Sequence, residues 1–263
     1  MTFETIKYSL SDGVAELRLN RPQMLNSFNV QMHQEIRTVI DQVENDKSIR
    51  CLLLTANGRG FCAGQDLNDR AVAPGGEAPD LGASVEAYYN PLVRSLTGMP
   101  KPVVCAVNGV AAGAGANIAL ACDIVLAARS ASFIESFCKI GVIPDSGGTW
   151  NLPRLVGLAR ARGLALTGEK ISAEKAESWG MIWRCVDDEA LMTEARALAK
   201  HLATQPTKGL GLIKQALLGS ANKSLHEQLE VEKELMRTAG RTHDYQEGVA
   251  AFTQKRQPNF KGE

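Results

Sequence analysis

The sequence has no surplus of either charge, because Lys plus Arg and Asp plus Glu each number 29 among its 263 residues. A neutral chain lacks the overall field that attracts nucleic acid or an anionic membrane. Apolar runs of membrane-spanning length are also missing, since Gly, Asp and Arg interrupt every candidate, and the first residues show no basic-then-apolar leader. We therefore expect a cytoplasmic protein with no nucleic-acid partner and no membrane partner.

Patterns for metal and disulfide chemistry are absent as well. The six cysteines lie mostly in apolar runs without the CxxC or CxxH spacing of zinc sites, so we expect buried, reduced thiols and no metal. The histidines sit in polar, helix-like stretches without catalytic spacing. Surface roles are therefore expected for all four, which are His33, His201, His226 and His243.

The chain does contain an alternation of strand-like and helix-like segments. Strands are predicted at residues 5–10 and 14–19, as a hairpin around Asp12-Gly13, and at 51–55, 103–107 and 124–128. Helices are predicted at 30–44, capped by Asn29, and at 84–96. From about residue 146 the chain reads as almost wholly helical, and residues 71–82 read as a mobile loop, either a lid or a plain surface excursion. This order predicts an α/β fold with largely parallel strands and a helical tail used for packing or assembly.

Two turns rich in small residues each follow a strand-like run. The first turn is residues 61–67 (FCAGQDL), and the second is residues 108–123 (NGVAAGAGANIALACD). Backbone N–H groups in such turns have no intrahelical partner, and small side chains leave them open to a ligand. Two such turns that face one point could grip a carbonyl oxygen that gains negative charge, which is an oxyanion hole. The pair of turns therefore indicates an enzyme.

A dinucleotide-binding interpretation of the second turn is weaker. Gly113 and Gly115 match the start of the glycine fingerprint, but its third position is Ile118, and Asp123 comes too early for the ribose contact. The glycines could also serve only tight packing between a helix and a sheet.

Asp145 is the preferred candidate for proton transfer. It follows Ile143 and Pro144 in an apolar run, where partial desolvation would make it a better base or acid. Capping of the next helix, by bonds to the amides of residues 147–149, is the alternative that the local sequence favours. Glu135 is a possible second acid, although a solvated or ion-paired glutamate is the commoner outcome for such a residue.

Three segments together resemble the crotonase superfamily, also called enoyl-CoA hydratase/isomerase. They are FCAGQDL, AVNGVAAGAGANIALACDIVLAA and IGVIPDSGGTWNLPRLVG, and the resemblance extends from residue 19 to residue 260. It implies an α/β spiral of ββα turns at residues 1–200 that carries a site for a coenzyme A thioester. It also implies a helical region at 201–263 that builds homotrimers or dimers of trimers.

The resemblance also assigns residues. It implies that the backbone N–H groups of Gln65 and Ala114 bind the thioester oxygen, aided by the dipole of the helix that begins there. Hydratases of the superfamily place two glutamates where this chain has Asn117 and Phe137, and they usually carry glycine where it has Asp145. One carboxylate suits the movement of a proton between two carbons, so an isomerase is implied, with Asp145 as acid and base. Asn117 is implied to orient the substrate or Asp145 by hydrogen bonding, with a plain packing role as the alternative.

Further segments resemble the superfamily's isomerases of ring-epoxidised phenylacetyl-CoA, namely GQDLNDR, YNPLVRSL, IPDSGGTW and HLATQPTKGLGLIKQA. These enzymes need no cofactor beyond the coenzyme A of the substrate. The same chemistry would allow double-bond shifts in enoyl-CoAs. The family pattern implies coenzyme A contacts from two places in the chain. Phe252 and Lys255, near the C-terminus, are implied to reach the coenzyme A bound to a neighbouring subunit. The contacts are Met24, Leu25, Ala63, Gln65, Asp66, Leu67, Phe252 and Lys255. For Lys255, an ordinary solvated helix end is an equal alternative.

Other functions stay open as alternatives. The nearest alternative is a hydratase or another enzyme of the crotonase type. Among these, an aryl-CoA dehalogenase is disfavoured, because Phe137 stands where those enzymes carry tryptophan and residues 84–96 contain no histidine. A non-catalytic partner protein or an RNA-binding relative is disfavoured by the neutral charge and by Asp145. A dinucleotide oxidoreductase is more remote.

Overall fold

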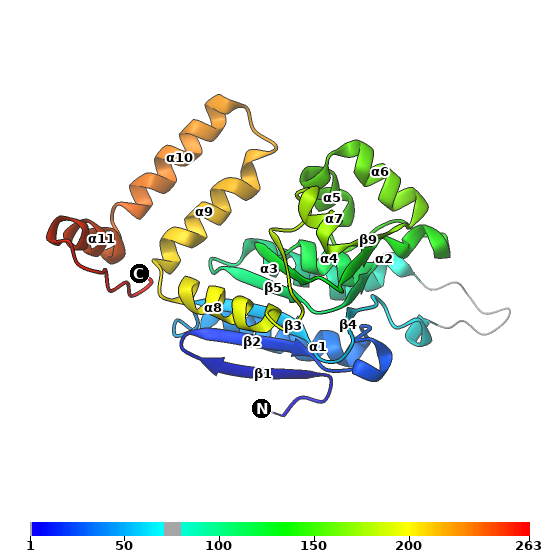
Figure 1. Ribbon diagram of the computed structural model, residues 1–263. Coiled ribbons are helices and arrows are strands. Elements are labelled where there is room, and N and C mark those ends of the chain that lie inside the picture. The colour runs from blue at the N-terminus through cyan, green and yellow to red at the C-terminus, as the bar shows by residue number, and fades with distance from the viewer. Residues whose placement is uncertain (1, 71–79) are drawn as a thin grey trace.

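Strands and helices alternate along most of the chain in a computed structural model, which describes residues 2–70 and 80–263 (Figure 1). The strands are β1 Ile6–Ser11, β2 Val14–Leu19, β3 Cys51–Ala56, β4 Gly60–Cys62, β5 Val103–Val107, β6 Val110–Ala112, β7 Ile124–Ala128, β8 Ser132–Ile134, β9 Lys170–Ser172 and β10 Arg184–Val186. The helices are α1 Val30–Asn45, α2 Leu81–Ser84, α3 Asn90–Gly98, α4 Ala114–Leu120, α5 Gly148–Val156, α6 Leu158–Thr167, α7 Ala173–Ser178, α8 Leu191–Ala203, α9 Thr207–Ser220, α10 Leu225–Ala239 and α11 His243–Gln254.

The strands form two sheets. The larger has the order β1-β2-β3-β5-β7-β10 and is parallel except for the β1–β2 hairpin, and the smaller has the order β4-β6-β8-β9 and is parallel except for β8–β9. In each of the pairs β3–β4, β5–β6 and β7–β8, the first strand joins the larger sheet and the second joins the smaller one. The chain thus repeats one ββα step around an axis, which confirms the predicted spiral.

Local sequence explains the elements that were predicted well. Asp12 and Gly13 both have positive φ, 53° and 75°, as a tight two-residue hairpin turn requires. The side chain of Asn29 accepts a hydrogen bond from the N–H of Met32, and the apolar face of α1 is buried.

Several short elements escaped prediction. The strands β4, β6, β8, β9 and β10 have three residues each, too few to show an alternating pattern, and two of them interrupt the region predicted as helical. The predicted helix at 84–96 is divided by a π-helical turn at Val85–Tyr89. Most of the predicted loop at 71–82 lies outside the described residues, and Gly82 belongs to α2.

Two predictions about buried groups had opposite outcomes. His33 is 6% exposed and stacks between Phe28 and Tyr88, so its predicted surface role is wrong. The apolar face of α1 carries it inward, and aromatic neighbours accept the ring. All six cysteines are unbonded thiols, as predicted, but only four are buried, since Cys138 and Cys185 are half-buried. Burial raises the pKa of Cys51 and of Cys62 to about 12, as expected for inert groups.

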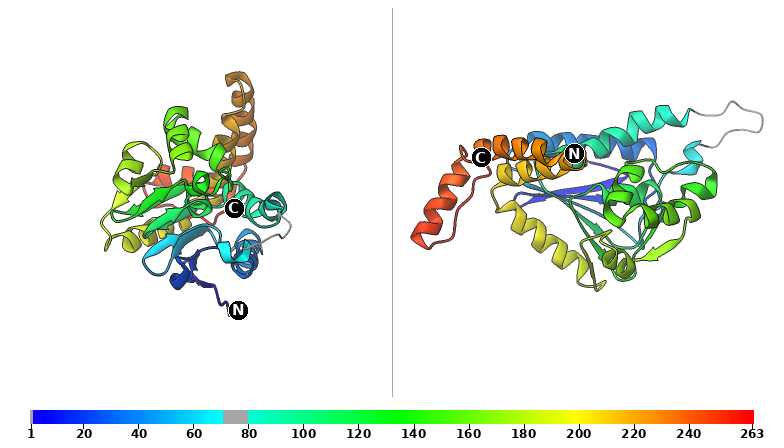
Figure 2. Two further views of the ribbon diagram at one scale, coloured as in Figure 1. Left: turned by 90° about the vertical axis from the view of Figure 1, so that its right-hand side faces the viewer. Right: turned by 90° about the horizontal axis from the view of Figure 1, so that it is seen from above.

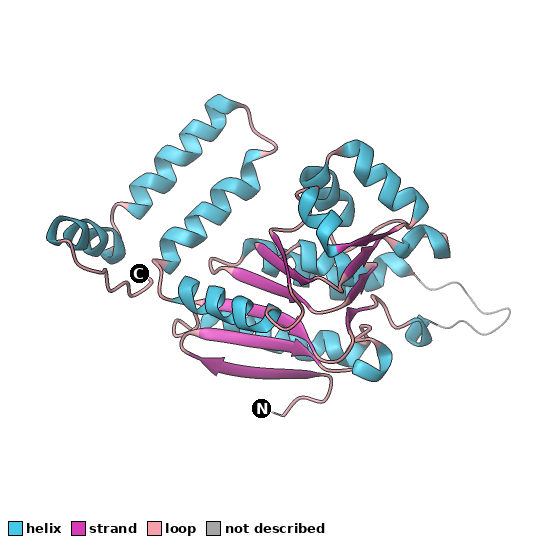
Figure 3. Ribbon diagram, in the orientation of Figure 1, coloured by secondary structure: helices cyan, strands magenta, loops and turns pink. Residues whose placement is uncertain are grey.

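Helix α8 packs across β2, β3, β5 and β7. The last three helices, α9 to α11, extend away from the sheets (Figure 3). Figure 2 shows α10 and α11 extending beyond the body of the protein. The predicted domain division at residue 200 falls inside α8 and stays a prediction. Within the described ranges, no helix is both long enough and apolar enough to cross a membrane.

Candidate active site

The two predicted turns meet in space. Strand β4 pairs with β6, which sets Cys62 beside Ala111. A Cβ atom added to Gly64, whose φ is 89°, would lie 2.9 Å from the carbonyl oxygen of Ala112 and 3.4 Å from the backbone nitrogen of Ala114. The glycine therefore permits a close approach of backbone to backbone that another residue would prevent.

The backbone of Gln65 is oriented by a bridge to Phe28. The N–H of Phe28 donates to the carbonyl oxygen of Gly64 at 2.7 Å, and the N–H of Asp66 donates to the carbonyl oxygen of Phe28 at 2.9 Å. A parallel bridge of this kind leaves the N–H of the middle residue, Gln65, on the opposite side. The side chain of Gln65 is also held, since the hydroxyl of Tyr89 donates to its Oε1 at 2.8 Å.

Ala114 is the first residue of α4, and it follows Gly113, whose φ is 53°. The N–H of a first helical residue has no intrahelical acceptor. The backbone of the preceding residue, Gly113, is held in place, because its N–H donates to the carbonyl oxygen of Ile134 at 2.9 Å. The N–H groups of Gln65 and Ala114 therefore belong to two adjoining turns, each anchored by the residues next to the donor.

Asp145 lies in the loop between the 3₁₀ turn Ser136–Ile140 and α5, and it is half-buried. The hydroxyl of Ser146 donates to its Oδ1 at 2.9 Å. The cap of α5 is Gly147, and the N–H of Gly148 donates to the backbone oxygen of Asp145 at 2.9 Å. The helix therefore begins at a glycine, and the backbone oxygen of Asp145 belongs to the turn before it, while the capping role of the Asp145 carboxylate stays a prediction.

Asn117 connects α4 to this loop. It is fully buried, and its Nδ2 donates to the backbone oxygen of Asp145 at 3.0 Å and to Oε2 of Glu135 at 3.4 Å. A Cβ atom added to Gly148 would lie 2.6 Å from Cγ of Asn117, so α5 can approach only because residue 148 is glycine. The amide of Asn117 thus holds Asp145 by its backbone, in line with an orienting role.

Glu135 follows directly after β8 and is 2% exposed, so the expectation of a solvated or ion-paired glutamate is wrong. Burial raises the pKa of Glu135 to about 7, the bond from Asn117 opposes the rise, and the negative charge of Asp145 adds to it. Its burial follows from strand β8, which is too short to be recognised. The sequence pointed to Glu135 as a possible second acid, but its burial depends on the pairing of β8 with β6, which local sequence does not show.

The predicted coenzyme A contacts divide into two groups. The N–H of Ala63 donates to the carbonyl oxygen of Leu25 at 2.9 Å, which brings the segments around Met24 and Leu67 together, and both of these side chains are exposed. Asp66 is buried and forms an ion pair with Arg21 at 2.9 Å.

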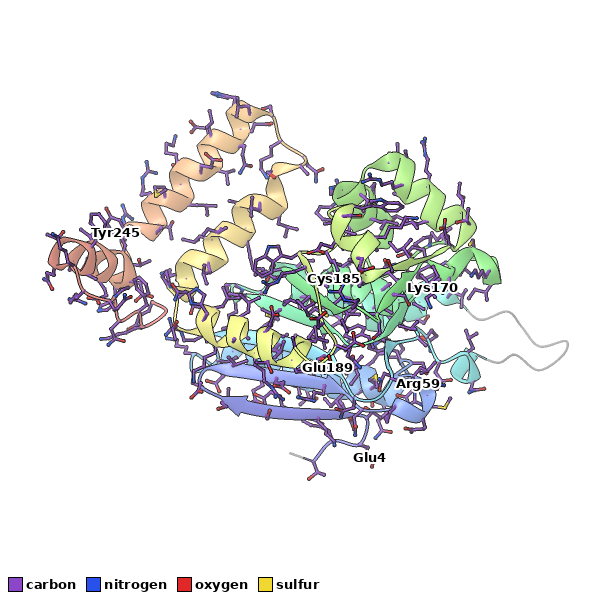
Figure 4. The ribbon with its side chains drawn as sticks, viewed as in Figure 1. Glu4, Arg59, Lys170, Cys185, Glu189 and Tyr245 are labelled. Carbon is purple, nitrogen blue, oxygen red and sulfur yellow. The ribbon has the colours of Figure 1, made fainter. Side chains whose placement is uncertain are left out.

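Phe252 and Lys255 do not join the other predicted contacts within one chain. Phe252 lies on α11 and Lys255 is the residue that ends this helix. Figure 4 places Tyr245, also on α11, on the opposite side of the molecule from Arg59 and Lys170. Among the residues that the structure describes, no group of three or more His, Cys, Asp or Glu side chains is placed to hold a metal ion.

Residues 9–263 match the sequence profile described as "Enoyl-CoA hydratase/isomerase". The chain belongs to this family. A relative in Escherichia coli K12, named 1,2-epoxyphenylacetyl-CoA isomerase, is 61% identical over 98% of this chain and 99% of the relative. A Rhodobacter capsulatus protein named "Probable enoyl-CoA hydratase" is 43% identical over the full length of both chains.

Solved structures of the family agree with the fold. An enoyl-CoA hydratase from Bacillus anthracis has a TM-score of 0.92 and 32% identity, covering 99% of this chain and all of the other. The family and the crotonase-type spiral predicted from the sequence are therefore confirmed.

Proposed function

We propose that this member of the enoyl-CoA hydratase/isomerase family is an acyl-CoA isomerase that converts ring-1,2-epoxyphenylacetyl-CoA to its oxepin isomer. The observation that carries the proposal is the similarity to the Escherichia coli 1,2-epoxyphenylacetyl-CoA isomerase, 61% identity over 98% of the chain. Two further observations support it: the two turns meet, and Asn117 on α4 links the second turn to the half-buried Asp145. Such a site can polarise a thioester and move a proton.

In the proposed mechanism, the thioester oxygen binds between the N–H groups of Gln65 and Ala114. These donors stabilise the negative charge that develops on the oxygen, and the loss of one such donor typically costs about 3 kcal/mol. The polarised thioester makes its α-carbon acidic. Asp145 removes a proton from the substrate and returns one, so that the product has the same composition as the substrate.

A hydratase function fits the side chains less well. Addition of water needs one group to take a proton from water and another to give a proton to carbon. Asn117 and Phe137, which stand where the hydratases of the family carry glutamates, can do neither. The proposed chemistry would also allow double-bond shifts in unsaturated acyl-CoAs, because these too need only the removal and return of a proton.

We also propose that Met24, Leu25, Ala63 and Leu67 contact the coenzyme A of the substrate, while Phe252 and Lys255 reach the ligand of a neighbouring subunit in a homotrimer or a dimer of trimers. Exposed apolar side chains on the last helices support assembly, among them Ile213, Leu217, Leu225 and Met236. An apolar groove of about 690 Å³ between α9 and α5 offers a second copy of the chain a place to dock. Two expectations remain predictions from the sequence. One is that the reaction needs no cofactor beyond the coenzyme A of the substrate, and the other is that the protein is cytoplasmic.

The first experiment gives the purified protein ring-1,2-epoxyphenylacetyl-CoA, a 3-enoyl-CoA and crotonyl-CoA in separate reactions. Products are identified by mass spectrometry and absorbance. We expect a product of unchanged mass from the epoxide and no gain of water by crotonyl-CoA. A gain of one water on crotonyl-CoA, with the epoxide untouched, would favour the hydratase alternative instead.

A further inference from the structure

Glu135 is a buried carboxyl group with an unusual set of partners. Its Oε2 accepts one hydrogen bond, from Nδ2 of Asn117, and its Oε1 is buried without a partner among the residues that the structure describes. An unpaired charged oxygen away from water is costly, whereas a protonated carboxyl group is tolerated there. The proposed mechanism makes no use of this group, although the same Asn117 amide holds the backbone of Asp145.

The surroundings of Glu135 contain few other charges. Helix α4 contributes the neutral Asn117, and the loop before α5 contributes Asp145, whose charge acts on Glu135. On the 3₁₀ turn that follows, Sγ of Cys138 lies 4.0 Å from the backbone oxygen of Glu135, and Lys139 packs beside Gly168. Among the described residues, Glu135 forms no ion pair with a Lys, Arg or His side chain, so Asp145 is its main charged neighbour.

We propose that Glu135 is a positioning residue that forms a coupled carboxyl pair with Asp145 across the Asn117 amide and sets the base strength of Asp145. The inference rests on the proposed role of Asp145 in isomerisation. Glu135 itself does not touch the substrate, because its carboxyl group is sealed from solvent.

The pair works through charge. When Asp145 takes a proton from the substrate, negative charge leaves Asp145 and develops on the thioester oxygen. A protonated Glu135 leaves the carboxylate of Asp145 undisturbed, whereas an ionised Glu135 repels it and makes Asp145 a stronger base. Burial, with a further contribution from the charge of Asp145, raises the pKa of Glu135 to about 7, so Glu135 changes its charge near neutral pH.

Infrared difference spectroscopy over a pH titration tests the coupling without substrate. We expect the signal of a protonated carboxyl group to vanish near pH 7 in the wild-type protein and to be absent in Glu135→Gln, which keeps the side chain's shape. In Asp145→Asn, the Glu135 signal should vanish at a lower pH, because the repelling charge is gone. A Glu135 signal that titrates at the same pH in Asp145→Asn, or that persists in Glu135→Gln, would overturn the proposal.

The pH profile of kcat gives the functional readout. We expect the wild-type kcat to rise in a step near pH 7, the step to be lost in Glu135→Gln, and Glu135→Asp to restore a step. The matched control is Glu16→Gln, which removes a partly buried carboxylate that pairs with Arg196 and Arg18 away from the site, and should keep the step. A step that survives in Glu135→Gln would refute a role for Glu135. If the wild-type protein does not isomerise the epoxide, the proposed function fails, and the infrared titration still decides whether the pair exists.

Discussion

The carboxylate of Asp145 is the side chain on which the proposed reaction depends most directly. Its backbone is held by Asn117 and by the first turn of α5, so a change of carboxylate to amide removes the proton-transfer group without disturbing these bonds. General acid–base groups typically contribute 10²- to 10⁴-fold to the rate.

We therefore expect Asp145→Asn to lower kcat on the order of 10³-fold, while the affinity for a non-reactive acyl-CoA measured by calorimetry stays within a few fold. Ser146→Ala is the comparison variant, because it removes only the 2.9 Å bond to Oδ1 and should cost far less. Near-normal turnover by Asp145→Asn would exclude it as the acid–base group.

For some residues the role could be predicted from the sequence, and for others their burial could not. Asp145 and Asn117 stand in recognisable motifs, so their importance was predictable, and the structure adds that an amide joins them. Glu135 and His33 were misjudged for one physical reason. Their burial depends on partners far away in the chain, the parallel pairing of β8 with β6 for Glu135 and the stacked ring of Tyr88 for His33.

Among helices and strands, the contact of α4 with β4 sets the geometry of the two turns. A Cβ atom at Gly115 would lie 2.7 Å from Cβ of Cys62 and 2.8 Å from its Sγ. These atoms belong to a fully buried side chain on a strand, so they cannot move aside freely. The small residues of the second turn therefore serve packing as well as ligand access, and the two interpretations given for them from sequence are compatible.

We expect Gly115→Ala to push α4 away from β4, to destabilise the fold by about 1–3 kcal/mol as overpacking does, and to lower kcat by displacing the N–H of Ala114. Denaturant unfolding and steady-state kinetics measure the two effects. Gly163→Ala in α6 is the control, since nothing lies within 4 Å of its added Cβ atom. It should stabilise the helix by about 1 kcal/mol. Equal behaviour of the two variants would contradict the packing argument.

Elements with strong end signals were predictable, while those held by distant pairing were not. Asn29 marks the start of α1, and Ser224 with Glu227 forms a capping box at the start of α10. The three-residue strands carry no such signal, because each exists only through hydrogen bonds to a strand contributed by another turn of the spiral.

At the scale of the whole molecule, the proposed assembly would give the outlying helices α9 to α11 a surface to pack against. Helices α9 to α11 carry large apolar side chains that are more than half exposed, such as Leu217 at 69% and Met236 at 71%. Exposed apolar patches of this kind mark interaction sites. The sequence predicted these helices, but it did not predict that they extend away from the sheets, because their position depends on packing between distant segments.

We expect light scattering to find a trimer or hexamer for the wild-type protein, and a monomer for the double variant Leu225→Asp and Met236→Asp. Both changes place charges on exposed apolar positions, so they should weaken assembly without unfolding a monomer. Leu10→Asp, on the edge strand β1, is the control and should leave the mass unchanged. A monomeric wild-type protein would remove the basis for contacts of Phe252 and Lys255 with a neighbouring subunit's ligand.

The proposed thioester donors are main-chain groups, and this has an evolutionary consequence. Any codon change at Gln65 or Ala114, except one to proline, leaves an N–H group in place. The group proposed to move the proton is the side chain of Asp145, in the loop before α5, and one substitution can exchange it. A lineage built on this scaffold can therefore inherit the activation of thioesters unchanged while its members diverge in the reaction that follows.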